Sequence, residues 1–111
     1  MAHIDLPAFN ALKDSTGADF IGELVAAFLD DAPALLAQMR AALQTSNAEE
    51  FRRAAHSMKS NAATFGAMEL SSMAKELEAL ARANNLDVGN RVDTLAAEFE
   101  NVKLELAQLI Q

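Results

Sequence analysis

The chain has 111 residues, of which 51% are hydrophobic, and it contains no cysteine, tryptophan or tyrosine. This length suits one domain with a single modest core, and the lack of cysteine excludes disulfides and thiolate metal sites. The formal net charge of −7 argues against a nucleic-acid partner, because contact with phosphates needs a basic face. We therefore expect residues 1–111 to form a single acidic domain that suits a reducing compartment.

The composition favours helix over sheet and argues against contact with a membrane. Glycine and proline occur only 4 and 2 times, and β-branched residues are few. No apolar run approaches the roughly 18 residues that a membrane-spanning helix needs. The first nine residues, MAHIDLPAF, lack the basic end and the continuous apolar run of a signal peptide. We predict an all-α cytoplasmic protein.

The first predicted element is a short helix near the N-terminus. Asp5 is placed to cap it, Pro7 suits its first turn, and Gly17 follows its end. Three apolar residues would let this helix cover one end of a core: Ile4, Phe9 and Leu12.

A long amphipathic stripe then predicts a second helix over residues 18–45, with apolar residues repeating at intervals of three and four. Pro33 interrupts it, and a proline inside a helix removes one backbone donor. Because the apolar stripe continues in phase past Pro33, we expect a bend near Asp30 and not two separate helices.

Three more helices follow. The third runs between Asn47 and Gly66, where Glu50 completes a capping box and the glycine ends the helix. A fourth helix ends near residues 83–85, and a fifth begins at about Asn90. Short connections between long amphipathic helices favour antiparallel neighbours. The prediction is an antiparallel up-down-up-down four-helix bundle with the short N-terminal helix packed across one end.

A lone histidine in the third helix, His56, is the candidate reactive group. At about 100° per residue it lies roughly 150° from a narrow apolar stripe on the same helix. That stripe consists of Phe51, Ala54, Ala55, Met58, Ala62 and Phe65. Four neighbours share the outward face with the histidine: Arg52, Lys59, Ser60 and Ala63. An imidazole among cations and small side chains is open to a second protein.

Each of these features also has a purely structural interpretation. His56 can be an ordinary surface histidine, and Arg52 and Arg53 can belong to a solvated face. His3, in the terminal segment, is interpreted as incidental. Four acidic residues are interpreted as solvating charge: Glu76, Glu78, Glu98 and Glu100.

Several classes of site are missing from the sequence. It has no phosphate-binding glycine loop, which argues against a self-contained kinase. It has no Glu-x-x-His pair for a metal, and no carboxylate near His56 in the sequence to orient the imidazole. Whatever chemistry the histidine performs, a second protein must supply the rest.

A resemblance to a known family lies in residues 51–78, FRRAAHSMKSNAATFGAMELSSMAKELE. This segment resembles the histidine-containing phosphotransfer (HPt) domain of multistep phosphorelays. The motif of that family is a helical histidine, a lysine three residues on, a small residue next and a glycine that ends the turn region. The preceding FIGELVAAFLDDAPALLAQMRAAL is similar to the second helix of the family. One departure is Ser60, because the family most often has glycine directly after the lysine.

The resemblance implies that His56 accepts a phosphoryl group from a receiver-domain aspartate and passes it to another receiver. Lys59 would steady the phosphoryl oxygens, while Ser60 and Ala63 would leave room for the receiver surface. We expect Arg52 beside them to contact the partner. The implied partners are receiver domains of response regulators and hybrid sensor histidine kinases. The chain would need no cofactor of its own, since magnesium would come with the receiver, and we expect a monomer.

Two other functions stay open. The bundle could be a docking module that binds receivers without carrying phosphate, although the presence of both His56 and Lys59 argues against that interpretation. It could instead be an enzyme that removes phosphate from receivers with a helical acid-amide pair. Asn61 is the nearest amide, and its helix offers no matched carboxylate. The start methionine and the lack of a linker favour a free-standing protein.

Overall fold

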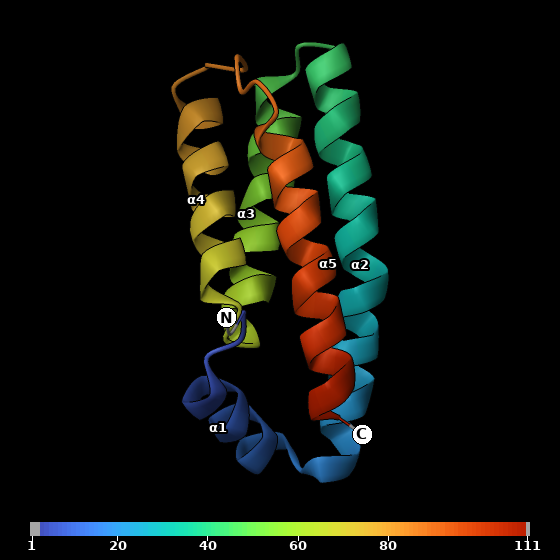
Figure 1. The fold of residues 1–111 in the computed structure, drawn as a ribbon. Coiled ribbons are helices and arrows are strands. Elements are labelled where there is room, and N and C mark those ends of the chain that lie inside the picture. The colour runs from blue at the N-terminus through green and yellow to red at the C-terminus, as the bar shows by residue number, and fades with distance from the viewer. Residues whose placement is uncertain (1–2, 111) are drawn as a thin grey trace.

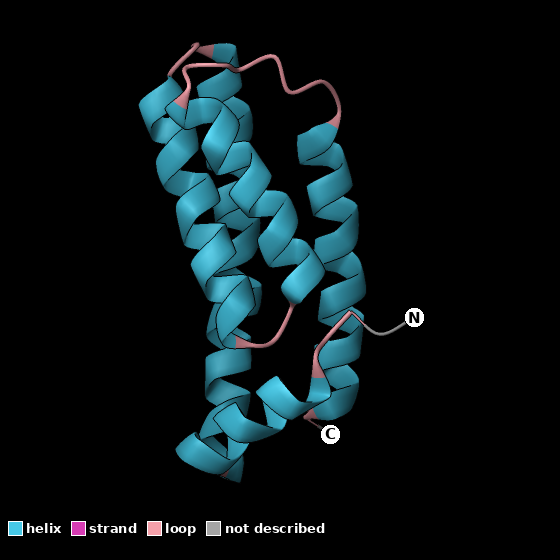
Figure 2. Cartoon of the chain, turned by 90° about the vertical axis from the view of Figure 1, so that its left-hand side faces the viewer, coloured by secondary structure: helices cyan, strands magenta, loops and turns pink. Residues whose placement is uncertain are grey.

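The computed structural model describes residues 3–110. It contains the helices α1 (Leu6–Thr16), α2 (Ala18–Gln44), α3 (Ala48–Thr64), α4 (Met68–Arg82) and α5 (Arg91–Leu109). No strand occurs between residues 3 and 110, so the prediction of an all-α protein is confirmed. Figure 1 shows α2 to α5 side by side along the long axis, with α1 at one end. Figure 2 shows the same arrangement from the side.

The ends of α3 follow the capping chemistry of its sequence. The Asn47 side chain accepts a hydrogen bond from the Glu50 N–H at 3.1 Å, which satisfies one free donor of the first turn. The predicted capping box is only half formed, because the Asn47 N–H donates to the Ala42 carbonyl at 2.8 Å. Beyond the helix, Gly66 adopts a φ of +80°, a conformation that favours glycine and ends the helix as expected.

The second helix continues through its proline. Pro33 lies inside α2 and is exposed, while Ala32 beside it is fully buried. The apolar stripe therefore stays in phase on both sides, and the prediction of one helix is confirmed.

The core forms where the apolar stripes of the helices meet. All six stripe residues of α3 and its C-cap are at most 5% exposed: Phe51, Ala54, Ala55, Met58, Ala62 and Phe65. The ring of Phe28 stacks on Phe65 at 5.1 Å and meets the edge of Phe99 at 5.8 Å, which joins α2, α3 and α5. This burial fixes the rotation of α3, so that its opposite face is open.

The N-terminal segment is tied down by specific contacts. The His3 Nδ1 lies 2.9 Å from Glu98 Oε2, and the His3 N–H donates to Glu105 Oε2 at 2.7 Å. Ile4 is 2% exposed and packs into the core beside Phe9. The interpretation of Glu98 as solvating charge was therefore wrong, because its carboxylate contacts the start of the chain and is 11% exposed. The interpretation of His3 as incidental to function stays a prediction.

Among residues 3–110, no helix is both long enough and apolar enough to cross a membrane.

Candidate functional site

His56 lies on the open face of α3, with 54% of its side chain exposed. Its neighbours in sequence, Ala55 and Met58, are fully buried and anchor the helix from the other side. The predicted outward position of His56 is thus confirmed. The imidazole is exposed on a helix whose rotation the core holds fixed.

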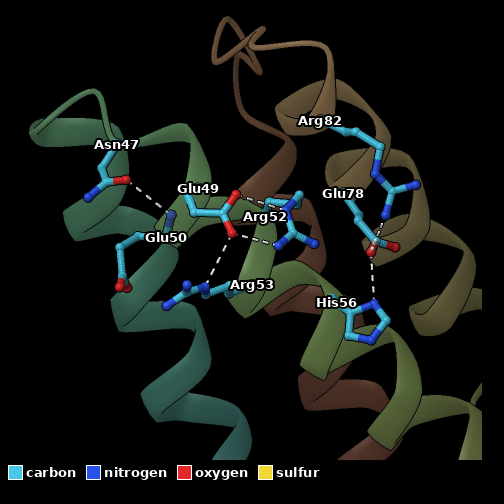
Figure 3. A network of polar contacts seen from close by, with 8 residues as sticks. All are labelled: Asn47, Glu49, Glu50, Arg52, Arg53, His56, Glu78 and Arg82. Atoms are coloured by element: carbon cyan, nitrogen blue, oxygen red, sulfur yellow. Dashed lines mark hydrogen bonds and ion pairs between the residues drawn. The ribbon is translucent and has the colours of Figure 1, made fainter.

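A buried carboxylate from the adjacent helix holds the imidazole. Glu78 in α4 is only 2% exposed, and its Oε2 lies 2.8 Å from His56 Nδ1. The same carboxylate accepts a hydrogen bond from Lys59 Nζ on Oε1 at 2.6 Å and one from Arg82 Nη2 on Oε2 at 3.2 Å. Figure 3 shows His56 and Arg82 converging on Glu78. One carboxylate therefore organises three nitrogen-bearing side chains.

The interpretation of Glu78 as solvating charge was wrong: the sequence has no carboxylate near His56, but the fold brings one to it. The two residues are 22 positions apart and meet because α3 and α4 pack together. A signal was present in the sequence: Glu78 follows Leu77 directly and lies four residues after Ala74 and three before Ala81. Those three residues are all buried, so this glutamate lies on the buried stripe of α4.

The charge of Glu78 decides which ring nitrogen of His56 is free. Burial by itself would raise the pKa of this carboxyl group, but hydrogen bonds from Lys59 and His56 outweigh burial and hold the pKa below its usual value. An ionised carboxylate only accepts hydrogen bonds, so Nδ1 carries the hydrogen that lies between them. In the neutral ring Nε2 then keeps its lone pair. Figure 3 shows this second nitrogen pointing away from Glu78.

Lys59 is half-buried beside the histidine, with 28% of its side chain exposed. It lies three residues after His56, and their side chains reach different oxygens of Glu78. Its ammonium group is therefore held close to the imidazole by a shared partner and by the helical spacing.

The three predicted docking residues differ in their surroundings. Ser60 and Ala63 are exposed on the face that carries His56. Arg52 is half-buried, and its guanidinium donates to Glu49 from Nε at 3.1 Å and from Nη2 at 2.6 Å. Their contact with a partner stays a prediction. In the part of the chain that the structure describes, no group of three or more histidine or acidic residues is placed to hold a metal ion.

The Hpt domain family matches residues 23–111 of the chain. The chain belongs to the Hpt domain family. Among solved structures, this Hpt domain is similar to histidine-containing phosphotransfer protein B (HptB) from Pseudomonas aeruginosa PAO1, with a TM-score of 0.89 and 28% identity. The match covers 98% of this chain and 95% of the HptB chain. No curated protein matches the sequence.

Family and structural likeness together give the Hpt domain its function, which is histidine phosphotransfer in phosphorelay signalling. The family works with receiver domains. Glu78 and Arg82 are the members of the site that reading the motif around His56 did not find.

Proposed function

We propose that His56 accepts a phosphoryl group from the aspartyl phosphate of one receiver domain and passes it to an aspartate of another. The observation that carries this proposal is the hydrogen bond between His56 Nδ1 and the buried Glu78 carboxylate. In the neutral ring this bond leaves Nε2 with its lone pair, and it fixes the direction of an imidazole whose side chain is 54% exposed. A nucleophilic imidazole needs these properties.

In the accepting step, the Nε2 lone pair attacks the phosphorus of the aspartyl phosphate. A bond forms between nitrogen and phosphorus, the bond from phosphorus to the aspartate oxygen breaks, and the carboxylate leaves with the electron pair. The hydrogen on Nδ1 stays there, and Glu78 stabilises the positive charge that the ring gains. The reverse sequence hands the phosphoryl group to the second receiver, so no proton has to leave the site.

Lys59 is the second catalytic residue of the proposal. Its ammonium group can offset the negative charge that the phosphoryl oxygens carry during transfer, because it is held on the same face as His56. The Hpt domain would bring no cofactor of its own, and magnesium would be held by the receiver. The carboxylate that contacts His56, Glu78, is already paired with Lys59 and Arg82, which supports assigning the magnesium to the receiver.

The proposed docking surface consists of Arg52, Ser60 and Ala63 around the histidine. Exposure of the two small residues supports it, since a receiver must approach His56 closely. We propose that the Hpt domain acts as a monomer in the cytoplasm, without binding nucleic acid or membranes. The strongly acidic composition supports the absence of nucleic acid.

The proposal includes one domain over residues 1–111, built as an antiparallel up-down-up-down four-helix bundle with α1 across one end. The chain path in Figure 1 supports this order, because the links α2–α3 and α4–α5 lie at one end and the link α3–α4 lies toward the other. Burial of Ile4 and Phe9 in the common core supports the inclusion of the N-terminal segment.

The test is transfer from a panel of phosphorylated receiver domains. The wild-type chain should gain an acid-labile phosphoryl group, and His56→Gln should gain none while keeping its circular dichroism spectrum. His3→Gln is the matched control, because it removes the other histidine of the chain. Receiver binding without any labelling of the wild type would favour the docking module, and labelling of His56→Gln would move the reactive site elsewhere.

A further inference from the structure

Glu49, in the first turn of α3, holds an arginine that lies next to the phosphotransfer site. Arg52 donates to this carboxylate from Nε at 3.1 Å and from Nη2 at 2.6 Å, and Arg53 donates from Nε at 3.3 Å. Two parallel bonds from one guanidinium fix its plane as well as its position. Arg52 is therefore held in one orientation.

Arg52 is placed between two carboxylates. It precedes His56 by four residues, so the two side chains are neighbours on the surface of α3. Its pKa is raised first by the hydrogen bond to Glu49 and also by the charge of Glu78, which places the guanidinium in the field of both. Figure 3 shows Arg52 on the Glu78 side of α3 and Arg53 on the other side.

Arg52 makes no hydrogen bond to Glu78 in the described residues, because His56, Lys59 and Arg82 already donate to the oxygens of this carboxylate. A phosphoryl group on His56 would give the Arg52 guanidinium a new acceptor. It brings about two negative charges and three acceptor oxygens to the neighbourhood of Arg52. The guanidinium then has two competing acceptors, the phosphoryl oxygens and Glu49.

We infer that Glu49 is a positioning residue that competes with the phosphoryl group on His56 for Arg52. By retaining the guanidinium, Glu49 limits how far the phosphorylated form is stabilised and keeps the phosphoryl group easy to transfer. This inference rests on the proposed function of His56. The hydrogen bond from Arg52 is the largest cause that lowers the pKa of Glu49 to about 2, so the competing carboxylate stays charged at neutral pH.

The experiment measures the equilibrium constant for transfer between one phosphorylated receiver and the Hpt domain. Glu49→Gln should shift the equilibrium toward phosphorylated Hpt domain by about two- to fivefold, the range expected for an exposed charge pair. Glu50→Gln is the matched control: it removes the same charge from the same helical turn, and its side chain makes no hydrogen bond to either arginine in residues 3–110. It should leave the constant unchanged.

A double-mutant cycle shows whether the effect runs through Arg52. In an Arg52→Ala background, Glu49→Gln should no longer change the equilibrium constant. The inference is overturned if Glu49→Gln and Glu50→Gln give the same constant, or if the Glu49→Gln shift persists without Arg52. If the wild-type chain takes no phosphoryl group from any receiver, the proposed function itself fails, and labelling of the wild type separates the two results.

Discussion

The Ser71 hydroxyl in α4 donates a hydrogen bond to the backbone carbonyl of Lys59 in α3 at 2.9 Å. The other end of Lys59 is also held by α4, since its ammonium group donates to Glu78 at 2.6 Å. Two contacts with one helix thus fix both the backbone and the charge of this lysine. The position of the ammonium group beside His56 is therefore a property of the α3–α4 packing.

Lys59→Ala should slow phosphoryl transfer in both directions by about 10- to 1,000-fold, as loss of one electrostatic stabiliser does. Receiver binding should weaken much less, because the ammonium group is half-buried and faces Glu78. Stopped-flow transfer rates and a binding isotherm on the same variant separate the effects. Lys103→Ala removes an exposed lysine from α5 and serves as the control. Equal losses in rate and affinity would make Lys59 a docking residue.

Glu78→Gln should keep the bundle folded but lower the rate of transfer to His56 by roughly 10- to 100-fold, by analogy with the loss of a carboxylate that orients a metal-ligating histidine. The amide keeps the size of the side chain, but the hydrogen bond from His56 Nδ1 then goes to a neutral acceptor and not to a carboxylate. Glu76→Gln, two residues away on the exposed side of the same helix, is the control. Transfer at the wild-type rate would show that His56 needs no carboxylate to orient it.

Acid should weaken the fold through the same carboxylate. The pKa of Glu78 is lowered in the folded chain from its ordinary value of 4.5, so its stabilising contribution is present above pH 4.5 and is lost as the pH falls through the folded-state pKa. Urea unfolding from neutral to acid pH should show the free energies of wild type and Glu78→Gln converging below pH 4.5. Glu100→Gln should follow the wild type. A constant gap at all pH values would contradict the linkage.

Gly66 does more than end α3. Its carbonyl accepts a hydrogen bond from the Asp5 N–H at 2.8 Å, and a Cβ at this position would stand 2.8 Å from the Asp5 carbonyl oxygen. Gly66→Ala therefore meets both a positive φ and a backbone contact, and it should destabilise the chain by about 1–3 kcal/mol. Gly89 also has a positive φ but open space around it. The difference in thermal stability between Gly66→Ala and Gly89→Ala therefore measures the cost of the contact with Asp5. Equal losses would mean that Asp5 is not held there.

Apolar spacing was enough to predict the helices and the outward position of His56. The apolar stripe of each helix can be located from its own sequence, and that stripe is the face that the core buries. Apolar spacing did not identify Glu78 as the partner of His56. Which side chains of α3 and α4 meet depends on how the two helices are rotated relative to each other, and the pattern of one helix does not give that. Glu78 nevertheless lies on the buried stripe of its own helix, so its burial could have been predicted from the sequence of α4. The contact between His3 and Glu98 joins residues 95 positions apart, and no local pattern encodes such a contact.

Ser60 tests the docking surface, because it lies one turn after His56 on the same face and is exposed. Ser60→Gly should keep or modestly improve transfer from receivers, at a cost of roughly 0.5 kcal/mol in helix stability. Ser60→Phe should block transfer from a receiver by filling the space that the partner needs, while phosphoramidate, a small phosphodonor, should still label His56. Normal transfer from receivers to Ser60→Phe would show that the partner approaches His56 from another side.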